Sequence, residues 1–500
     1  MNALLVYPES PDTFWSFKHA LKFISKKALH PPLGLLTVAA MLPEGWEKRL
    51  VDMNVNRLSD QEIEWADYVF IGAMAIQKTS VHDVVARCRE AGVKIVAGGP
   101  LFTAAPQDFE DVDHLVLNEA EVTLPDFLRD LNEGKAKHLY GTESFPGLDN
   151  TSTPLWRLVN LRKYASMNIQ YSRGCPFNCE FCDITTLYGR KTRAKPAYRI
   201  LEELDTLHSL GWRGDVFFVD DNFIGNKKKL KKDVLPAMIE WMKERRYPFN
   251  FATEASINLA DDETLMKLMI RAGFDSVFVG IETPDETSLA ECGKYQNRNR
   301  DLMASVEKIQ SFGLRVRGGF IVGFDNDSPD IFERQIEFIQ KSGIITAMVG
   351  MLNAPRGTGL YKRLMKEGRL LKDVSGDNTD FSINFIPRMG YGNLAAGYRK
   401  IIQGIYSPRP YYERVKSFLR AYRPREKRKK HFHFGYIRCH FHYPGAVFKS
   451  IFLLGIKDRA RRYYWKLIFW SLFRRPRLLP MAITYSIYGF HFRKVFARHL

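Results

Sequence analysis

Three cysteines, Cys175, Cys179 and Cys182, lie within eight residues in the order Cys-x3-Cys-x2-Cys. The run before them favours a strand that ends at Gly174, so the thiols are predicted to share the loop that follows. Thiolates bind iron–sulfur clusters and zinc. Three cysteines leave one iron of a four-iron cluster open, whereas structural zinc normally takes four protein ligands. Because no other cysteine or histidine lies close by in the sequence, the motif favours a cluster, with zinc as the alternative.

Elements that could position this loop recur along the middle of the chain. Six runs favour strands and are separated by helical patterns, which is typical of β–α units. Six such units predict a partial TIM-type barrel, (β/α)6, open on one side, with its functional residues at the carboxyl ends of the strands. The six runs are residues 169–172, 216–219, 249–253, 276–280, 315–322 and 347–352.

Acidic residues follow three of these predicted strands: Asp220 after the second, Glu254 after the third and Glu282 after the fourth. Buried carboxylates accept hydrogen bonds from hydroxyl and ammonium groups, so acids at this edge could bind a ribose or an amino group. Any one of them alone could also be a helix cap or a salt-bridged rim acid. Their repetition at successive strand ends favours a binding site.

Residues 1–146 alternate short apolar runs with helical patterns, which predicts a flavodoxin-like, Rossmann-type sheet covered by helices on both faces. Ligands of such sheets lie beyond the carboxyl ends of the strands. Small or polar residues at these ends would let a large flat ligand approach the backbone, and the same fold without a cofactor is the alternative. Strands are expected at residues 3–7, 49–53, 68–72, 94–97 and 114–117, and the residues at their ends include Tyr7, Asp52, Asn54, Gly98, Gly99 and Pro100.

The net charge of +18 is concentrated at the C-terminal end of the 500-residue chain. Residues 401–500 contain 23 lysines and arginines against three acids, so the preceding residues are close to neutral. Six cysteines, three of them in one motif, argue against a disulfide framework and for a reducing compartment. The first residues lack the basic and apolar segments of a signal peptide, so we expect a cytoplasmic protein.

The C-terminal region combines basic with aromatic side chains. Residues 447–454, 463–473 and 478–490 are apolar and aromatic, and none reaches the roughly 18 uninterrupted apolar residues of a spanning helix. Helices that mix Trp and Tyr with Lys and Arg are typical of a membrane surface, which we favour here over RNA binding or an ordinary packing subdomain. The alternating histidines from His431 to His442 could bind a metal, although such residues are more often simply exposed.

The cysteine motif, with the aromatic Phe181 before its last cysteine, resembles that of the radical-SAM enzymes. The N-terminal pattern, with Pro-Pro-Leu-Gly-Leu-Leu at residues 31–36, resembles the cobalamin-binding domain that precedes one large subclass of them. Two further segments, Phe-Trp-Ser-Phe-Lys at 14–18 and Tyr-Gly-Phe-His-Phe at 488–492, extend the resemblance over nearly the whole chain. The sequence is similar to the group that includes hopanoid methylases and archaeal tetraether-lipid ring synthases.

This resemblance implies three cofactors: a 4Fe–4S cluster on the three cysteines, S-adenosylmethionine and cobalamin. In the family, the positions of two of the strand-end glutamates contact S-adenosylmethionine, and the segment at 318–323 lies against its adenine. Cobalamin enzymes of the methionine-synthase type place a histidine on cobalt from an Asp-x-His-x-x-Gly motif, but residues 52–56 here read Asp-Met-Asn-Val-Asn, so we expect no histidine ligand from this loop. The cofactor contacts expected are Phe181, Asp220, Glu254, Glu282, Gly319 and Ile321, with Tyr7, Asp52, Asn54, Gly98, Gly99 and Pro100 at the cobalamin.

The expected architecture is α/β. It comprises a cobalamin-binding domain at 1–146, a linker at 147–165, a radical-SAM core at 166–370 and a basic, aromatic-rich helical region at 371–500. The implied reaction modifies an unactivated carbon of a hydrophobic, lipid or hopanoid-like substrate, most simply by C-methylation. We expect an electron donor such as flavodoxin or ferredoxin and a position at the inner face of the membrane. The alternatives are carbon–carbon bond formation or cyclisation of a lipid, nucleic-acid modification, and a non-catalytic membrane-binding protein.

Overall fold

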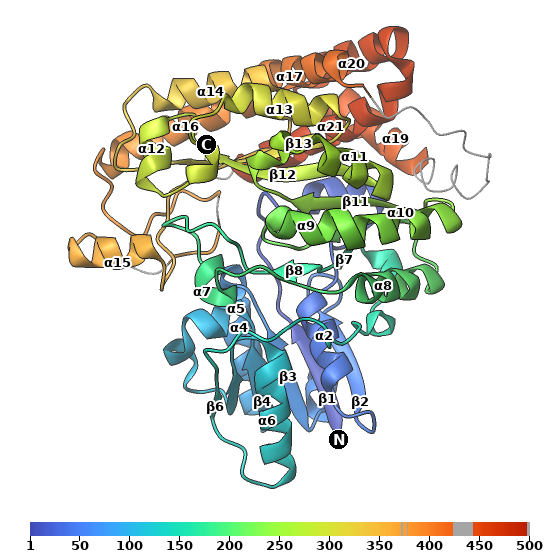
Figure 1. Ribbon diagram of the computed structural model, residues 1–500, viewed down its shortest axis with the longest axis vertical. Coiled ribbons are helices and arrows are strands. Elements are labelled where there is room, and N and C mark those ends of the chain that lie inside the picture. Colours follow the sequence, from blue (N-terminus) through green and yellow to red (C-terminus); the bar gives the residue numbers. More distant parts are fainter. Residues whose placement is uncertain (372–373, 378, 424–443, 498–500) are drawn as a thin grey trace.

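The computed structural model of the protein describes residues 1–371, 374–377, 379–423 and 444–497 (Figure 1). The histidines from His431 to His442, and the basic run beyond Arg423, lie outside the described residues. Figure 1 shows the N-terminal sheet at one end of the molecule, a second sheet in the middle and C-terminal helices at the other end.

Six parallel strands form the N-terminal sheet in the order β2-β1-β3-β4-β5-β6. In β1, Leu4 and Val6 pack in one apolar core, and Ala3 and Leu5 pack in another on the opposite face. Both faces are therefore covered, as predicted for this fold. The elements are β1 Asn2–Tyr7, α2 Leu33–Met41, β2 Glu47–Asp52, α3 Asp60–Trp65, β3 Tyr68–Gly72, α4 Lys78–Glu90, β4 Lys94–Gly98, α5 Pro100–Ala104, β5 His114–Val116, α6 Ala120–Asn132 and β6 Leu139–Tyr140.

Six further parallel strands form the second sheet in the order β14-β13-β12-β11-β10-β7. The edge strands β7 and β14 are not paired with each other in the described chain, so the barrel is open on one side, as expected. The strands are β7 Met167–Ile169, β10 Gly214–Phe218, β11 Phe249–Glu254, β12 Phe274–Glu282, β13 Arg315–Val322 and β14 Ala347–Met351, and a small hairpin joins β8 Ser172–Arg173 to β9 Arg193–Ala194. The intervening helices are α7 Ile184–Tyr188, α8 Ala197–Ser209, α9 Lys227–Lys229, α10 Leu235–Glu244, α11 Glu263–Ala272, α12 Glu286–Glu291, α13 Leu302–Ser311 and α14 Ile331–Ser342.

Four neighbouring side chains make much of the inner wall of this barrel apolar and accessible, although Arg317, in register with Phe278, adds one charged group to the same face. In β11, Phe251 is buried while its neighbour Ala252 is half-exposed. Phe217, Phe278 and Met348 are half-exposed too, and Phe217 pairs with Ala252 in the sheet register. Because alternate residues of a strand face opposite sides, these four side chains lie on the inner face, and we call them the lumen wall.

A segment from the start of the chain covers the open side of the barrel. This N-terminal strap, residues 8–32, connects β1 with α2 and contains α1 Lys18–Leu21. At the edge strand β14, Nε1 of Trp15 lies 3.0 Å from Sδ of Met348, and its indole lies 5.4 Å from the ring of Phe278 in β12. At the other edge strand, Nδ2 of Asn168 donates to the carbonyl of Pro31 (3.1 Å).

The C-terminal helix α21 Leu479–Phe496 holds the strap in place. The ring of Phe14 stacks on Phe492 with centroids 4.4 Å apart, and Phe17 lies 5.1 Å from the ring of His491. Nε2 of His491 is 3.0 Å from the carbonyl oxygen of Phe14. The two segments that carried the family resemblance from opposite ends of the sequence are therefore in contact.

This packing corrects the expectation that all three aromatic blocks lie on a membrane. In α21, Ala482, Phe492 and Phe496 are buried, because the helix packs among the strap, α16 Tyr391–Tyr406 and α17 Pro408–Ala421. In the block at 463–473, within α20 Arg461–Arg474, one face is buried too, through Tyr464 and Leu467. Within the described parts of the chain, no helix is long and apolar enough to span a membrane.

Candidate active site

The cysteine loop begins at a turn that requires glycine. Gly174 has φ +85°, and a Cβ there would lie 2.9 Å from the carbonyl oxygens of Tyr188, Gly189 and Lys191. These carbonyls belong to the returning chain, so the loop is closed at its base.

All three cysteines are free and half-buried. Nδ2 of Asn222 lies 4.0 Å from Sγ of Cys175, and Nε2 of Gln296 lies 3.8 Å from Sγ of Cys179. Burial raises the pKa of Cys175 and of Cys182, so thiolates here need a positively charged partner. Among the described residues, no group of three His, Cys, Asp or Glu side chains is placed to hold one metal ion. A four-iron cluster fits this donor set, because each cysteine then binds a different iron cation.

The two acids after β10 differ in what they bind. Asp220 accepts hydrogen bonds from the backbone of Tyr171 (3.0 Å) and from the backbone and Oγ of Ser172, the latter at 2.6 Å. Both of its oxygens are thus engaged in fixing the chain before the cysteine loop. Asp221 has a buried Oδ2 without a hydrogen-bond partner, and burial together with the charge of Asp220 raises its pKa to about 7. The sequence pointed to Asp220, but Asp221 presents the free oxygen.

Glu254 ends β11, and no hydrogen bond or ion pair joins its carboxyl group to another described residue. Burial and the charges of Asp221 and Asp220 raise its pKa to about 8. A cation bound among these acids would stabilise their charged forms. The positively charged sulfonium of S-adenosylmethionine fits such a site.

Replacing Glu254 by glutamine is expected to stabilise the cofactor-free protein at alkaline pH. The carboxyl group binds its proton more tightly when folded than when unfolded, where its pKa is about 4.3, so the free energy of unfolding falls as the pH rises from about 4.3 to about 8. We expect Glu254→Gln and the wild type to unfold at the same temperature at about pH 4, and the variant to be more stable by about 4 to 5 kcal/mol at about pH 8. Thermal unfolding followed by circular dichroism measures this difference, and equal unfolding temperatures at both pH values would contradict it.

Glu282 forms an ion pair beside the cysteine loop. It has φ +63°, an uncommon left-handed conformation, and its Oε1 accepts a hydrogen bond from Nζ of Lys294 (2.6 Å). A Cβ on Gly280 would overlap this oxygen and lie 2.9 Å from Nζ, so glycine makes room for the pair. Burial acts to lower the pKa of Lys294, but the charges of Glu282 and Cys179 raise it above its usual value. Lys294 therefore places a lasting positive charge next to the cysteines.

The remaining residues expected at S-adenosylmethionine lie around β13. The ring of Phe181 is 6.3 Å from that of Phe324, which follows this strand. A Cβ on Gly319 would lie 2.7 Å from the ring of Phe278, so the glycine brings the backbone close to the lumen wall. Ile321, two residues on, is half-exposed. The structure thus brings these residues to the edge that carries Glu254 and Glu282.

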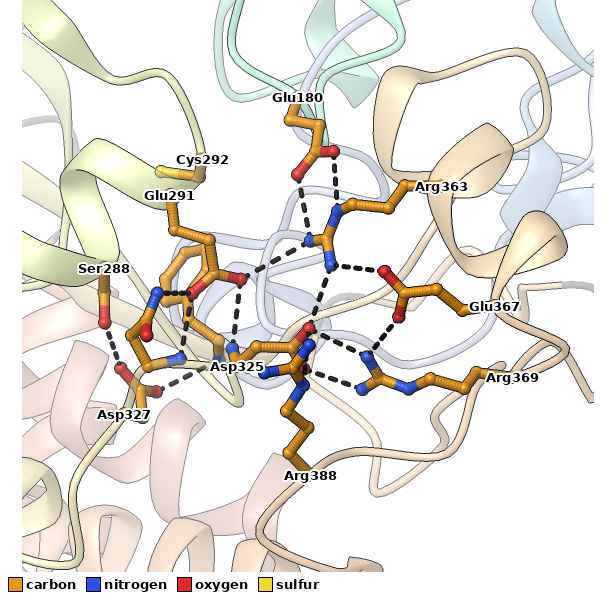
Figure 2. A network of polar contacts seen from close by, with 12 residues as sticks. Glu180, Ser288, Glu291, Cys292, Asp325, Asp327, Arg363, Glu367, Arg369 and Arg388 are labelled. Carbon is orange, nitrogen blue, oxygen red and sulfur yellow. Dashed lines mark hydrogen bonds and ion pairs between the residues drawn. The ribbon is translucent and has the colours of Figure 1, made fainter.

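A network of ion pairs holds the cysteine loop against the end of β13 (Figure 2). Arg363, in α15 Gly359–Lys366, donates to both oxygens of Glu180 (2.8 and 3.0 Å) and to Asp325 (2.9 Å). Glu180 lies inside the cysteine motif, and Asp325 follows β13. Asp325 also accepts two hydrogen bonds from Arg369 (2.7 and 2.8 Å). The network therefore fixes the middle of the cysteine loop to the strand that carries Gly319.

The residues expected at cobalamin lie along the carboxyl edge of the N-terminal sheet. Asp52 is buried and accepts hydrogen bonds from the backbone and side chain of Asn54 (both 2.9 Å) and from the hydroxyl of Tyr164 (2.9 Å). Burial and the charge of Asp52 raise the pKa of Tyr7 to about 12, so its hydroxyl stays protonated. These bonds tie the Asp52 loop to the segment that leads into the barrel.

The glycines after β4 have a backbone role of their own. A Cβ on Gly98 would lie 2.5 Å from the carbonyl oxygen of Val116, and Gly99 has φ +96°. They allow the sharp turn at which Pro100 starts α5. This turn keeps side chains away from the edge, so a flat ligand such as cobalamin fits there.

The carboxyl edges of the two sheets face each other. Arg173, at the start of the cysteine loop, donates to Glu119 (2.6 Å) and to both oxygens of Glu121 (2.8 and 2.9 Å). Arg193 donates to both oxygens of Glu119 (2.6 and 2.9 Å). Both glutamates follow β5, at the carboxyl edge of the N-terminal sheet. Cofactors bound at the two carboxyl edges would therefore lie between the two sheets.

Three residues of this site, Lys294, Arg363 and Trp15, were not predicted from the sequence to be functional. Lys294 lies in no recognisable motif. Arg363 pairs with Glu180 across 183 positions of sequence, a separation at which local patterns carry no signal. Trp15 belonged to a segment noted for resemblance, but its place at the lumen wall depends on the tertiary path of the strap.

Family comparisons agree with this arrangement. A B12-binding domain family matches residues 23–128, the radical-SAM superfamily matches residues 169–339, and a domain of unknown function, DUF4070, matches residues 358–500.

Two similar proteins extend over most of the chain. An uncharacterized methyltransferase of Synechocystis sp., sll1242, is 40% identical over 501 residues, covering 98% of this chain and 91% of that protein. The hopanoid C-2 methylase of Rhodopseudomonas palustris is 35% identical over 410 residues, covering 81% of this chain and 77% of that protein. The chain belongs to the cobalamin-dependent radical-SAM family of methyltransferases. Its members use a 4Fe–4S cluster, S-adenosylmethionine and cobalamin, as the resemblance implied.

Solved structures of cobalamin-dependent radical-SAM enzymes share the fold. OxsB with aqua-cobalamin bound has a TM-score of 0.60 at 16% identity, covering 99% of this chain and 79% of that chain. TsrM from Kitasatospora setae, with cobalamin and a 4Fe–4S cluster bound, has a TM-score of 0.57 at 13% identity, covering 75% of this chain and 79% of that chain. The expected fold class, a Rossmann-type domain followed by a partial barrel and a helical C-terminal region, is confirmed.

Proposed function

We propose that this cobalamin-dependent radical-SAM enzyme methylates an unactivated carbon of a hydrophobic, lipid or hopanoid-like substrate. The observation that carries the proposal is the lumen wall, which is apolar, accessible and placed beside the acids and cysteines at the carboxyl edge of the barrel. Trp15 adds a large apolar surface from the strap. A polar substrate would leave its hydrogen-bonding groups without partners against this wall, whereas a hydrocarbon would not.

The roles of the chain's residues follow from their positions. Cys175, Cys179 and Cys182 would hold the cluster, and Lys294 would offset the negative charge of their thiolates. When bound, the cluster supplies an electron that converts S-adenosylmethionine to a hydrogen-abstracting 5′-deoxyadenosyl radical, and cobalamin supplies the methyl group. The strap and the lumen wall would exclude water from the reacting carbon.

We also propose which residues contact S-adenosylmethionine and cobalamin. Acids of the barrel edge would bind the positively charged and hydroxyl groups of S-adenosylmethionine, and the β13 backbone would lie against its adenine. The edge of the N-terminal sheet would hold cobalamin. The residues in these roles are Phe181, Asp220 as a positioning residue, Asp221, Glu254, Glu282, Gly319 and Ile321, and then Tyr7, Asp52, Asn54, Gly98, Gly99 and Pro100.

Residues 52–56 would supply no histidine ligand to the cobalt of bound cobalamin, because that loop contains none. The electron paramagnetic resonance spectrum of the protein reconstituted with Co(II) cobalamin should then lack the nitrogen splitting of an axial histidine. A nitrogen splitting that changes when the protein is labelled with 15N-histidine would contradict this expectation.

An electron donor such as flavodoxin or ferredoxin would reduce the cluster, and we place the enzyme in the cytoplasm at the inner face of the membrane. The nearest alternative reaction, carbon–carbon bond formation or ring closure in a lipid, uses the same apolar lumen. It would yield a product without an added methyl group. Nucleic-acid modification is a further alternative, but the apolar lumen wall does not favour it.

The proposal is tested by giving the reconstituted enzyme a reductant and S-adenosylmethionine with a deuterated methyl group, together with fractions of a bacterial extract. We expect deuterium in the apolar lipid fraction, on a product heavier than its parent by one labelled methyl group in place of a hydrogen. Label found in the RNA fraction or in polar metabolites would overturn the lipid assignment. A lipid product lighter than its parent by two hydrogens would favour ring closure.

A further inference from the structure

Two neighbouring C-terminal elements expose apolar side chains at helical spacing. On α19 Pro444–Ser450 and the π-helical turn Ile451–Lys457 that continues it, Phe448, Phe452 and Ile456 follow one another at intervals of four residues. On α20, Phe469, Leu472 and Phe473 form a similar stripe. These six side chains, which we call the aromatic face, are between 45 and 79% exposed. Side chains at these spacings share one side of a helix, and most apolar stripes of this kind face a protein core.

The two stripes are joined by Trp465. Its Nε1 donates to the carbonyl of Gly455 (2.9 Å), next to Ile456. Its indole also stacks on Phe469, with ring centroids 5.4 Å apart. A Cβ on Gly455 would lie 2.9 Å from the indole, so glycine permits this close contact. Trp465 therefore joins the two elements that carry the stripes, toward the end of the molecule away from the N-terminal sheet (Figure 1).

The side chains around the aromatic face are nearly all basic. Residues 445–480 contain nine lysines and arginines and one acid, Asp458. That acid is already paired, since it accepts a hydrogen bond from Arg493 (2.7 Å). Lys457 places its Nζ 4.5 Å from the ring of Phe452, so cationic and apolar groups are interleaved. The basic residues are Lys449, Lys457, Arg459, Arg461, Arg462, Lys466, Arg474, Arg475 and Arg477.

Exposed aromatics bordered by cations complement a bilayer that has anionic headgroups over an apolar interior. We infer that the aromatic face docks the enzyme on an anionic phospholipid bilayer. The face also lies next to the strap, because Nζ of Lys449 donates to the carbonyl of Lys22 and to Oγ of Ser25 (both 3.0 Å). Docking would thus place the segment that closes the barrel beside the bilayer. The inference rests on the proposed function in one respect: docking would give the enzyme access to a lipid substrate.

The test is co-sedimentation of the full-length protein with vesicles, which requires no turnover. The vesicles contain either phosphatidylcholine alone or phosphatidylcholine mixed with phosphatidylglycerol. We expect strong binding to the mixed vesicles, weak binding to phosphatidylcholine, and release at high salt. Replacing Phe448, Phe452 and Phe473 together by serine should reduce binding at least about tenfold, and replacing Arg461, Arg462 and Lys466 by glutamine should remove the preference for anionic lipid. The matched control replaces three residues exposed elsewhere, Tyr198, Leu210 and Met365, by serine, and should bind as the wild type does.

Equal binding by the aromatic and control variants, or no binding of the wild type to mixed vesicles, would overturn the inference. So would binding of an RNA oligonucleotide in place of vesicles, or a dimer that dissociates when the three phenylalanines are replaced. Formation of 5′-deoxyadenosine in the absence of vesicles is measured on the same variants. A variant that loses vesicle binding but keeps this reaction shows that failure of docking and failure of the proposed function are separate results.

Discussion

Cys179→Ala is expected to abolish both cluster assembly and cleavage of S-adenosylmethionine. The alanine removes the central thiol of the motif, and two cysteines cannot hold a cubane that normally has three or four cysteine ligands. After anaerobic reconstitution, iron should fall from about four atoms per wild-type chain to less than about one, and reductive formation of 5′-deoxyadenosine should become undetectable. Iron analysis and chromatography of the nucleoside measure these two quantities.

The matched control is Cys292→Ala. Cys292 is buried beside the loop, where its carbonyl accepts a hydrogen bond from the backbone of Glu180 (2.8 Å), but its thiol lies outside the motif. Alanine keeps that backbone bond, so this variant should retain its iron and its reaction. If Cys179→Ala kept its iron while Cys292→Ala lost it, the assignment of cluster ligands would be wrong.

Arg363→Met is expected to loosen the cysteine loop without touching a cluster ligand. The methionine keeps much of the apolar length of the side chain but removes five hydrogen bonds, two to Glu180 and one each to Asp325, Glu291 and Glu367. Because the arginine is partly exposed, the cost should be about 1.5 to 2 kcal/mol, below the value for a fully buried pair. Opening of the loop should become at least about tenfold more frequent. Reconstituted protein exposed to an iron chelator should therefore lose its cluster absorbance about tenfold faster.

Arg369→Met is the control that distinguishes loss of the bond to Glu180 from loss of other ion pairs in the network. Arg369 binds Asp325 with two hydrogen bonds but has no bond to Glu180 (Figure 2). This variant should lose its cluster close to the wild-type rate, and Arg363→Lys should lie between the two because it keeps the charge without the planar fork. Equal rates of cluster loss in Arg363→Met and Arg369→Met would show that the bond to Glu180 does not hold the loop.

Local patterns in the sequence were sufficient for the framework of the fold. Each strand of the two six-stranded sheets except the short β6 was expected within a few residues, because buried parallel strands read as apolar runs separated by helical patterns. The short antiparallel pair β8 and β9 was not expected as separate strands. The same patterns placed Glu254 and Glu282 at one edge, since parallel strands bring their carboxyl ends together. The cysteine loop followed from the spacing of its own residues.

Contacts between distant segments were not predictable in this way. Phe14 stacks on Phe492, so the two ends of the chain are in contact. The aromatic helix α21, which was expected at a membrane, is therefore part of the core. The pairing of Asp220 with Ser172, which leaves Asp221 with the free oxygen, depends on side-chain directions after β10. Hydrophobic periodicity tells which side of a helix is apolar but not what covers it, so α21 and α20 looked alike in sequence.

The most direct test of the account counts products in one reaction. Enzyme loaded with iron and cobalamin is given a reductant, the apolar lipid fraction and S-adenosylmethionine with a deuterated methyl group. We predict labelled lipid and 5′-deoxyadenosine in about equal amounts, both absent with Cys179→Ala. Labelled lipid formed without 5′-deoxyadenosine, or formed equally well by the Cys179→Ala variant, would contradict radical methylation at this site.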